Sequence, residues 1–265
     1  MLSSPPTSGT LGAAGVVMNS LSGSIRGGLD RMLSVGYGVV YDYIFERFPP
    51  YQQLQAEVRG LVAAGAPAAG DRRDMRVLDI ACGPGSLTCL LAEAGFSVTG
   101  LDAYGALVEV AKEKRRAKHL SNLVFRHADL ARGNTFREGT FDQVVNIHSL
   151  YVHPAPDELL KEAYRVLKPG GHAVFVNRTR HVGQWSTLRE IREREGLRAA
   201  LRCLLLWVLP NAIFEAARKP IGPHYWDEAA FAARLRTAGF AVLEMRRTFL
   251  NGASLLAWAR KNVEE

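Results

Sequence analysis

Between residues 77 and 176, short apolar runs alternate with segments whose apolar positions recur every three or four residues. The short runs predict buried strands, and the helical periodicity predicts amphipathic helices between them. The expected strands are 77–80, 97–101, 122–126, 141–146 and 172–176, and the expected helices are 86–94, 105–118 and 157–166. This alternation indicates a parallel sheet with helices on both faces.

The pattern changes in the carboxyl-terminal part of the chain. A helix is expected over residues 228–238, with Gly239 as its C-terminal stop. Two strands follow, 241–249 and 254–261, joined near Asn251-Gly252, a dipeptide typical of hairpin turns. The predicted fold class is therefore α/β: a Rossmann-like, seven-stranded, mostly parallel sheet that ends in an antiparallel hairpin.

Three further segments surround or interrupt this core. Residues 1–28 are predicted to be a flexible lead, and residues 29–70 a helical segment in which Pro49-Pro50 separates two helices. The main domain spans residues 71–265, with a helical insertion at about 178–223, after the fifth strand. The insertion contains an arginine-rich helix over 186–202 and an apolar run over 203–210.

Composition and charge narrow the function classes. At 265 residues, 48% of them hydrophobic, the chain can bury a core without disulfide or metal support. The net charge of +7 suggests nucleic acid or an anionic membrane as partners. However, the basic residues are scattered, and the densest run, 112–119, continues a helix as a solvated face. We therefore expect no nucleic-acid partner.

The cysteines indicate the compartment. Cys82, Cys89 and Cys203 show neither disulfide nor metal spacing, which favours a reducing cytoplasm. The first 25 residues contain no basic residue, so no secretory signal is expected there. No run in the sequence reaches the length needed to span a bilayer.

The turn after the first strand indicates a nucleotide site. Gly83 and Gly85 let a ligand lie against the turn backbone, where a side chain would block it. The second strand ends on Asp102, and an acid at that place can hold both hydroxyls of a ribose. Strand, glycine turn, helix, strand and acid together predict a nucleoside pocket.

Asp79 and Thr88 indicate which nucleoside binds. A dinucleotide fingerprint requires a third glycine where this chain has Thr88. Asp79 lies just before the turn, where its carboxylate would repel a pyrophosphate and attract an ammonium or a sulfonium. This charge favours S-adenosylmethionine over NAD.

These motifs resemble those of class I S-adenosylmethionine-dependent methyltransferases. The pattern Asp79-x-Ala81-x-Gly83-x-Gly85 matches their cofactor motif, with alanine at 81 where many members carry glycine. Three later segments resemble family motifs and come in the family's order. They are 127–130 at the end of the third strand, 141–146 as the fourth strand, and 167–171 as the turn that leads into the fifth. The chain is most similar to the small-molecule type, which includes the ubiquinone and menaquinone biosynthesis enzymes.

The resemblance implies S-adenosyl-L-methionine as cofactor and assigns its contacts. Asp129 would bind the adenine amino group, and Tyr41 would lie near the methionine end of the cofactor. The other implied cofactor-binding residues are Asp79, Ala81, Gly83, Gly85, Asp102, Ala103, Leu130 and Asn146. Residues 29–70 would form a helical lid, and the insertion after the fifth strand a helical cap over the acceptor.

The acceptor and the catalytic group are less closely defined. His148 and Tyr151 follow the fourth strand, where a base or an acceptor-orienting group is needed. His153, which precedes Pro154, is expected to be exposed. Because the quinone-type O-methylating branch carries a metal-linked acid cluster where this chain has His148, Tyr151 and Val152, we expect no metal. The apolar cap predicts a small hydrophobic acceptor. It could instead be a packing helix or make a weak contact with an anionic membrane.

The resulting functional hypothesis is methyl transfer from S-adenosylmethionine to a small, natural-product, quinone-like or lipid-like acceptor by in-line displacement. The alternative is a protein that keeps the cofactor site but acts as a cyclase or a binding module.

Asp102→Ala tests the predicted ribose contact. We expect cofactor affinity to fall several-fold or more, because hydrogen bonds to a charged group contribute roughly 1.5–3 kcal/mol. Calorimetric titration with S-adenosylmethionine measures the effect, and an unchanged affinity would remove Asp102 from the pocket.

Overall fold

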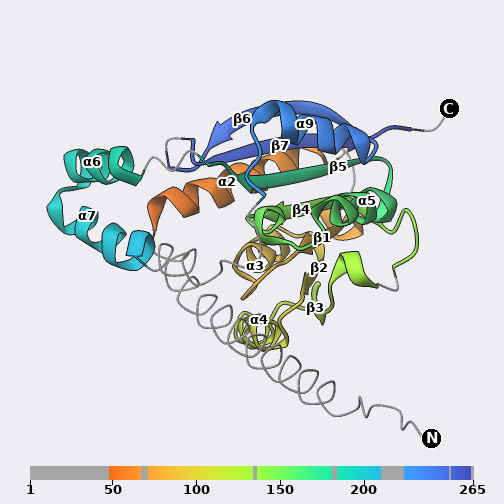
Figure 1. The fold of residues 1–265 in the computed structure, drawn as a ribbon. Helices are drawn as coiled ribbons and strands as arrows, with labels where there is room; N and C mark the ends of the chain where they lie inside the picture. Colours follow the sequence, from red (N-terminus) through yellow and green to blue (C-terminus); the bar gives the residue numbers. More distant parts are fainter. Residues whose placement is uncertain are drawn as a thin grey trace, which may run out of the picture.

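The computed structural model describes residues 48–66, 71–133, 136–180, 184–209, 224–250 and 252–263. Within these residues, seven strands form a single sheet in the order β3-β2-β1-β4-β5-β7-β6 (Figure 1). The expected flexible lead, Tyr41 and most of the expected lid lie outside the described residues. So do residues 181–183 and 210–223 of the insertion.

Five strands pair in parallel and the last two form an antiparallel hairpin, as the sequence predicts; within the sheet only β7 runs opposite to the others. The parallel strands are β1 (Arg76–Ile80), β2 (Ser97–Asp102), β3 (Leu123–His127), β4 (Phe141–Ile147) and β5 (Leu167–Arg178). The hairpin consists of β6 (Phe240–Thr248) and β7 (Ser254–Lys261), with β7 antiparallel to β5. Because parallel strands point the same way, β1, β2, β4 and β5 all end at one edge of the sheet.

Helices cover both faces of the sheet (Figure 1). One hydrophobic core forms under α2 (Pro49–Ala64), α3 (Ser86–Glu93) and α4 (Gly105–Ala117). A second core forms under α5 (Pro156–Val166) and α9 (Glu228–Thr237). Alternate residues of the central strands enter the two cores, so both faces of β1, β4 and β5 are buried. The predicted fold class is confirmed.

Helix α2 belongs to this packing through one apolar face. The proline pair occupies its first turn, where a missing N–H costs nothing. Tyr51, Leu54, Val58 and Val62 are buried against the sheet. The helix is also tied to the sheet by polar contacts: Glu57 accepts hydrogen bonds from Arg246 at 2.9 Å and Thr248 at 2.7 Å.

The insertion differs from the sequence prediction. The single helix expected over residues 186–202 is wrong, because two helices occur instead: α6 (Gln184–Glu195) and α7 (Leu197–Cys203). Gly196 separates them with a φ of 90°, a left-handed conformation that ends α6 and that glycine adopts readily. A wider π-helical turn, η4 (Leu204–Val208), continues α7.

The fifth strand also begins earlier than predicted. Residues 167–171, expected as a turn, form the start of β5, because Leu167 pairs with Phe141 across a register shift in β4. Two short 3₁₀ turns follow strand ends, η2 (Leu130–Arg132) after β3 and η3 (Leu150–Val152) after β4. These turns carry several of the predicted site residues.

Candidate functional site

The turn between β1 and α3 leaves open space beside its backbone. Ala81, Gly83 and Gly85 all have positive φ, at 55°, 55° and 78°. A Cβ added to Gly83 would meet nothing within 4 Å, whereas one added to Gly85 would lie 2.6 Å from the Phe125 ring. Gly83 therefore borders space that a ligand can use, and Gly85 is required by the packing of the turn itself.

Asp102 joins the end of β2 to this turn. Its Oδ2 accepts a hydrogen bond from the Gly83 N–H at 2.8 Å, and its Oδ1 accepts one from the Tyr104 N–H at 2.8 Å. The side chain is buried, and desolvation raises the pKa of its carboxyl despite these two hydrogen bonds. Each oxygen keeps a further lone pair, so the carboxylate can accept donors from a ligand as well.

Asp79 is a second buried carboxylate close to the same turn. Burial raises the pKa of Asp79 to about 7, and the nearby Asp102 charge adds to the shift. A hydrogen bond from Thr88 Oγ1 at 2.6 Å opposes it. Thr88 thus occupies the place of the third dinucleotide glycine and supports the acid. A positively charged ligand would stabilise the ionised form of Asp79.

Asp129 lies after β3 and caps the η2 turn. Its Oδ1 accepts a hydrogen bond from the Ala131 N–H at 3.0 Å and contacts His153 Nε2 at 3.2 Å. Leu130, next to it, is buried. Only 14% of the His153 side chain is exposed, so the sequence-based view that His153 is exposed is wrong.

Asn146 ends β4 with an incomplete set of hydrogen bonds. Its Nδ2 donates to Ile80 O at 2.8 Å and to Ser149 Oγ at 2.5 Å. Among the described residues its buried Oδ1 has no hydrogen-bond partner, and the same holds for Oδ1 of Asn177, near the end of β5. Buried polar atoms usually find partners, so two orphaned acceptors at this edge suit a ligand that carries donors, such as an ammonium.

His148 follows Asn146 in a strained backbone conformation, with a φ of 53°. Its Nε2 lies 2.8 Å from Ser254 Oγ, and its ring packs 5.1 Å from that of Phe249. Desolvation, and then the charge of Arg178, lower the pKa of His148 to about 3. The burial of the ring and the neighbouring guanidinium both disfavour the charged imidazolium.

Tyr151 belongs to a neighbouring aromatic group. Its buried ring stacks on Tyr225 with centroids 5.8 Å apart, and the Arg178 guanidinium lies over it at 5.4 Å. Arg178, at the end of β5, thus connects the surroundings of His148 and Tyr151. Arg178 was not expected at the site from the sequence, although its charge, close after an apolar strand, was a signal of a functional position.

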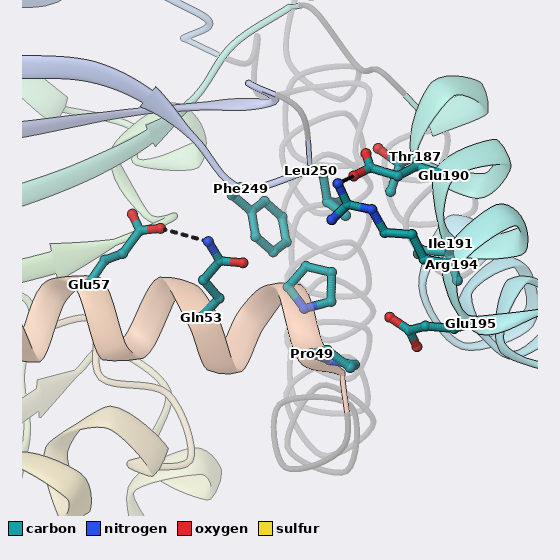
Figure 2. Close-up of a pocket in the computed structure, with 11 residues that line it drawn as sticks. Pro49, Gln53, Glu57, Thr187, Glu190, Ile191, Arg194, Glu195, Phe249 and Leu250 are labelled. Atoms are coloured by element: carbon teal, nitrogen blue, oxygen red, sulfur yellow. Dashed lines mark hydrogen bonds and ion pairs between the residues drawn. The ribbon is translucent and has the colours of Figure 1, made fainter.

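A cavity of about 300 Å³ opens between α2, α6 and the turn after β6 (Figure 2). Its apolar lining includes Pro49, Ile191, Phe249 and Leu250, and its polar lining includes Gln53, Glu57, Thr187, Glu190, Arg194 and Glu195. Phe249 belongs both to this lining and to the contact with His148. Among the described residues, the insertion reaches this cavity through α6.

Comparison with known proteins identifies the family. The methyltransferase-domain family matches residues 78–175. Demethylmenaquinone methyltransferase of Clavibacter sepedonicus is 33% identical over 189 residues, covering 69% of this chain and 71% of the relative. The first two curated relatives are matched over 55% and 43% of their length, so the chain spans about half of each.

Solved structures share the fold. Magnesium protoporphyrin IX methyltransferase from Synechocystis PCC 6803 with bound SAH is similar with a TM-score of 0.57 and 21% identity, over 80% of this chain and 84% of that one. The [4+2]-cyclase SpnF is similar with a TM-score of 0.57 and 21% identity, over 81% and 83%. At such identities these likenesses concern the fold alone.

Fold, turn and buried acids together define a nucleoside-binding α/β protein with a preference for a cationic ligand. The chain belongs to the class I S-adenosylmethionine-dependent methyltransferases. Its cofactor is S-adenosylmethionine. The residues fit this cofactor, because Gly83 leaves space, Asp79 and Asp102 supply negative charge, and Asn146 offers an unpaired acceptor.

Gly83→Ala and Gly85→Ala form a matched pair of variants. Each places alanine in a left-handed conformation, at a cost of about 1–2 kcal/mol. Gly83→Ala should lose at least about tenfold in cofactor affinity, because its methyl group enters the open space. Gly85→Ala should unfold at a lower temperature than Gly83→Ala, since its methyl group additionally overlaps the Phe125 ring. Calorimetric titration and thermal unfolding measure the two effects, and wild-type affinity in Gly83→Ala would place the cofactor elsewhere.

Cofactor binding should depend on the ionisation of Asp79. The acid is charged above its pKa of about 7, and the cationic cofactor binds that form better. Affinity should therefore fall as the pH drops, by about tenfold between pH 8 and pH 6. Asp79→Asn serves as the control, because it should bind weakly at both pH values and lose the pH dependence that Asp79 causes. Parallel profiles for the two proteins would contradict this role.

Proposed function

We propose that this protein transfers a methyl group from S-adenosylmethionine to a small acceptor with a substantial apolar part. The observation that carries the proposal is a cavity between α2, α6 and the turn after β6, whose lining residue Phe249 packs 5.1 Å from the ring of His148, just after β4. The name of the demethylmenaquinone methyltransferase relative supports a quinone-like acceptor, with natural-product and lipid-like molecules in the same chemical range.

The cofactor residues would divide the molecule among them. Asp102 would bind the ribose hydroxyls, Asp129 the adenine amino group, and Asp79 with Asn146 the charged methionine end. Ala81, Gly83, Gly85, Ala103 and Leu130 would shape the surface against which the nucleoside lies, and Tyr41 would close the methionine end. When bound, the cofactor supplies a methyl group already activated on a sulfonium.

The acceptor side would act mainly by placement. Since the methyl group is already activated, the protein needs to align the acceptor in line with it and exclude water. Pro49, Ile191, Phe249 and Leu250 would hold an apolar body, while His148 and Tyr151 would orient the reacting atom. With a pKa of about 3, the His148 imidazole is neutral at pH 7 and a poor proton acceptor, so orientation suits it better than base catalysis.

The three free cysteines support a reducing compartment, and we propose the cytoplasm. The alternative function remains a cyclase or a binding module that holds the cofactor without consuming it. The low basicity of His148 favours this alternative, because methylation of an acceptor that must lose a proton would need a different base.

Transfer of radiolabelled methyl from the cofactor into a small-molecule extract tests the proposal. Asp79→Asn and a heat-treated protein serve as controls. Label in an organic-soluble product supports methyl transfer to a small acceptor. Tight cofactor binding without label transfer to any extract would support the cyclase or binding-module alternative.

His148→Gln separates orientation from base catalysis. Glutamine can keep a hydrogen bond to Ser254 but cannot act as the imidazole base. We expect turnover of the variant to stay close to that of the wild type. The wild-type rate should show no step near pH 6.5, because the His148 ring is already neutral there. A base with an ordinary imidazole pKa would instead show such a step, and removal of a base at this position would cost roughly 100-fold or more whatever its pKa. Initial rates between pH 5 and 8 distinguish the two outcomes.

A further inference from the structure

An exposed apolar surface lies on the insertion, away from the cavity of Figure 2. Among the described residues, eight large hydrophobic side chains are exposed, and five of them belong to residues 185–209. They are Trp185 at 79%, Leu197 at 62%, Leu201 at 47%, Leu205 at 59% and Leu209 at 45% exposure. Single exposed leucines are ordinary, but a concentration on one segment marks an interaction surface.

The four leucines follow each other at intervals of four residues and form one line, which we call the leucine stripe. The opposite side of the same helical run buries Ala200, Cys203 and Val208 in the core. Residues 197–209 are therefore apolar on both sides, and the fold covers only one of them. A helix that is apolar all round is normally buried on all sides.

The π-helical turn η4 keeps the two sides separate. In a regular α-helix, Val208 would lie on the same side as Leu197, within about 20° around the helix axis, because each residue rotates the chain by about 100°. The wider turn over Leu204–Val208 reduces that rotation. As a result Val208 stays buried while Leu205 and Leu209 stay exposed. The geometry thus preserves an exposed apolar line along the whole run.

Trp185 extends the stripe into a broader patch. A groove of about 500 Å³ between α6 and α7 is lined by Trp185, Leu188, Leu197, Leu201 and Leu204, with Arg189, Arg192 and Glu193 at its edge, where Arg189 pairs with Glu193 at 3.0 Å. The groove makes the tryptophan and the leucine stripe one continuous surface, which we call the α6–α7 patch. Aromatic and leucine side chains of this kind are typical of helices that lie in a membrane interface.

The charges beside the leucine stripe are positive. Residues 196–209 contain Arg198 and Arg202 and no acidic residue. Both arginines are exposed, and neither is paired with a carboxylate among the described residues. They directly follow Leu197 and Leu201, so the guanidinium groups flank the leucine stripe. Arginines beside an exposed apolar face complement anionic headgroups.

We infer that the α6–α7 patch docks on the surface of an anionic membrane, with the leucine stripe and Trp185 entering the interface and Arg198 and Arg202 contacting lipid phosphates. The contact is peripheral, because no described helix is long and apolar enough to cross a bilayer. Helix α6 contributes both to this patch and to the cavity of Figure 2. A docked protein would therefore hold its cavity close to lipid-dissolved molecules.

Vesicle co-sedimentation of the full chain tests the inference, using phosphatidylcholine alone and a mixture with phosphatidylglycerol. We expect binding to the mixture, weakened by 0.5 M salt. The double variant Leu201→Gln/Leu205→Gln should bind at least about tenfold more weakly, since each buried leucine contributes strongly. Arg198→Gln/Arg202→Gln should lose about fivefold per arginine on anionic vesicles only. Tryptophan emission should shift to the blue with vesicles, and less in Trp185→Phe.

Two controls carry the same chemical changes elsewhere. Leu243→Gln replaces an exposed leucine on β6, and Arg236→Gln an exposed arginine near the end of α9, and both should bind as the wild type does. Equal binding of the leucine double variant, or no wild-type binding, would overturn the inference. The inference would also be overturned if the protein formed a dimer in solution and Leu201→Gln/Leu205→Gln dissociated it, because the patch would then join two copies of the chain. Cofactor titration of each variant keeps this result separate from the proposed methyl transfer.

Discussion

Asp79 and Asp102 place two buried carboxylates on either side of one glycine turn, and much of the site depends on how that charge is held. Asp102 is held by two backbone N–H groups and Asp79 by one hydroxyl, so neither carboxylate has a cation as partner among the described contacts. Desolvation and mutual repulsion raise the pKa of Asp79 to about 7. Such a pair is stabilised by a ligand that brings positive charge and hydroxyl donors together. A sulfonium nucleoside has both.

The sheet explains why these groups meet. Asp79, Asp102, Asn146 and Arg178 come from four strands, and parallel pairing brings all four strand ends to one edge. The Asp102 carboxylate then connects the end of β2 to the turn after β1. The antiparallel pair β5–β7 adds Ser254 opposite Arg178 and so supplies the partner of His148. The order of strands thus determines which side chains can act together.

Sequence patterns predicted the strands, the terminal hairpin and the glycine turn well, because buried strands and glycine turns leave strong local signals. They failed where the decisive contact is distant. The pKa of His148 depends on burial against Phe249 and Tyr51 and on the charge of Arg178, which are far away in sequence. The division of the insertion depended on one residue, Gly196, whose positive φ the helical periodicity around it concealed. His153 appeared exposed because its partner Asp129 comes from another strand end.

The insertion also shows why hydrophobicity alone does not identify a pocket. The apolar run after residue 203 suggested an acceptor cavity, yet its described residues pack into the core on one side and face outward on the other. The cavity itself is lined by the mixed, partly charged face of α6. Under the proposed function, an apolar acceptor would need only a few apolar walls inside the protein, with its polar end near residues such as Thr187, whose buried hydroxyl has no hydrogen-bond partner among the described residues. The strongest apolar surface of the insertion is left for contacts outside the fold.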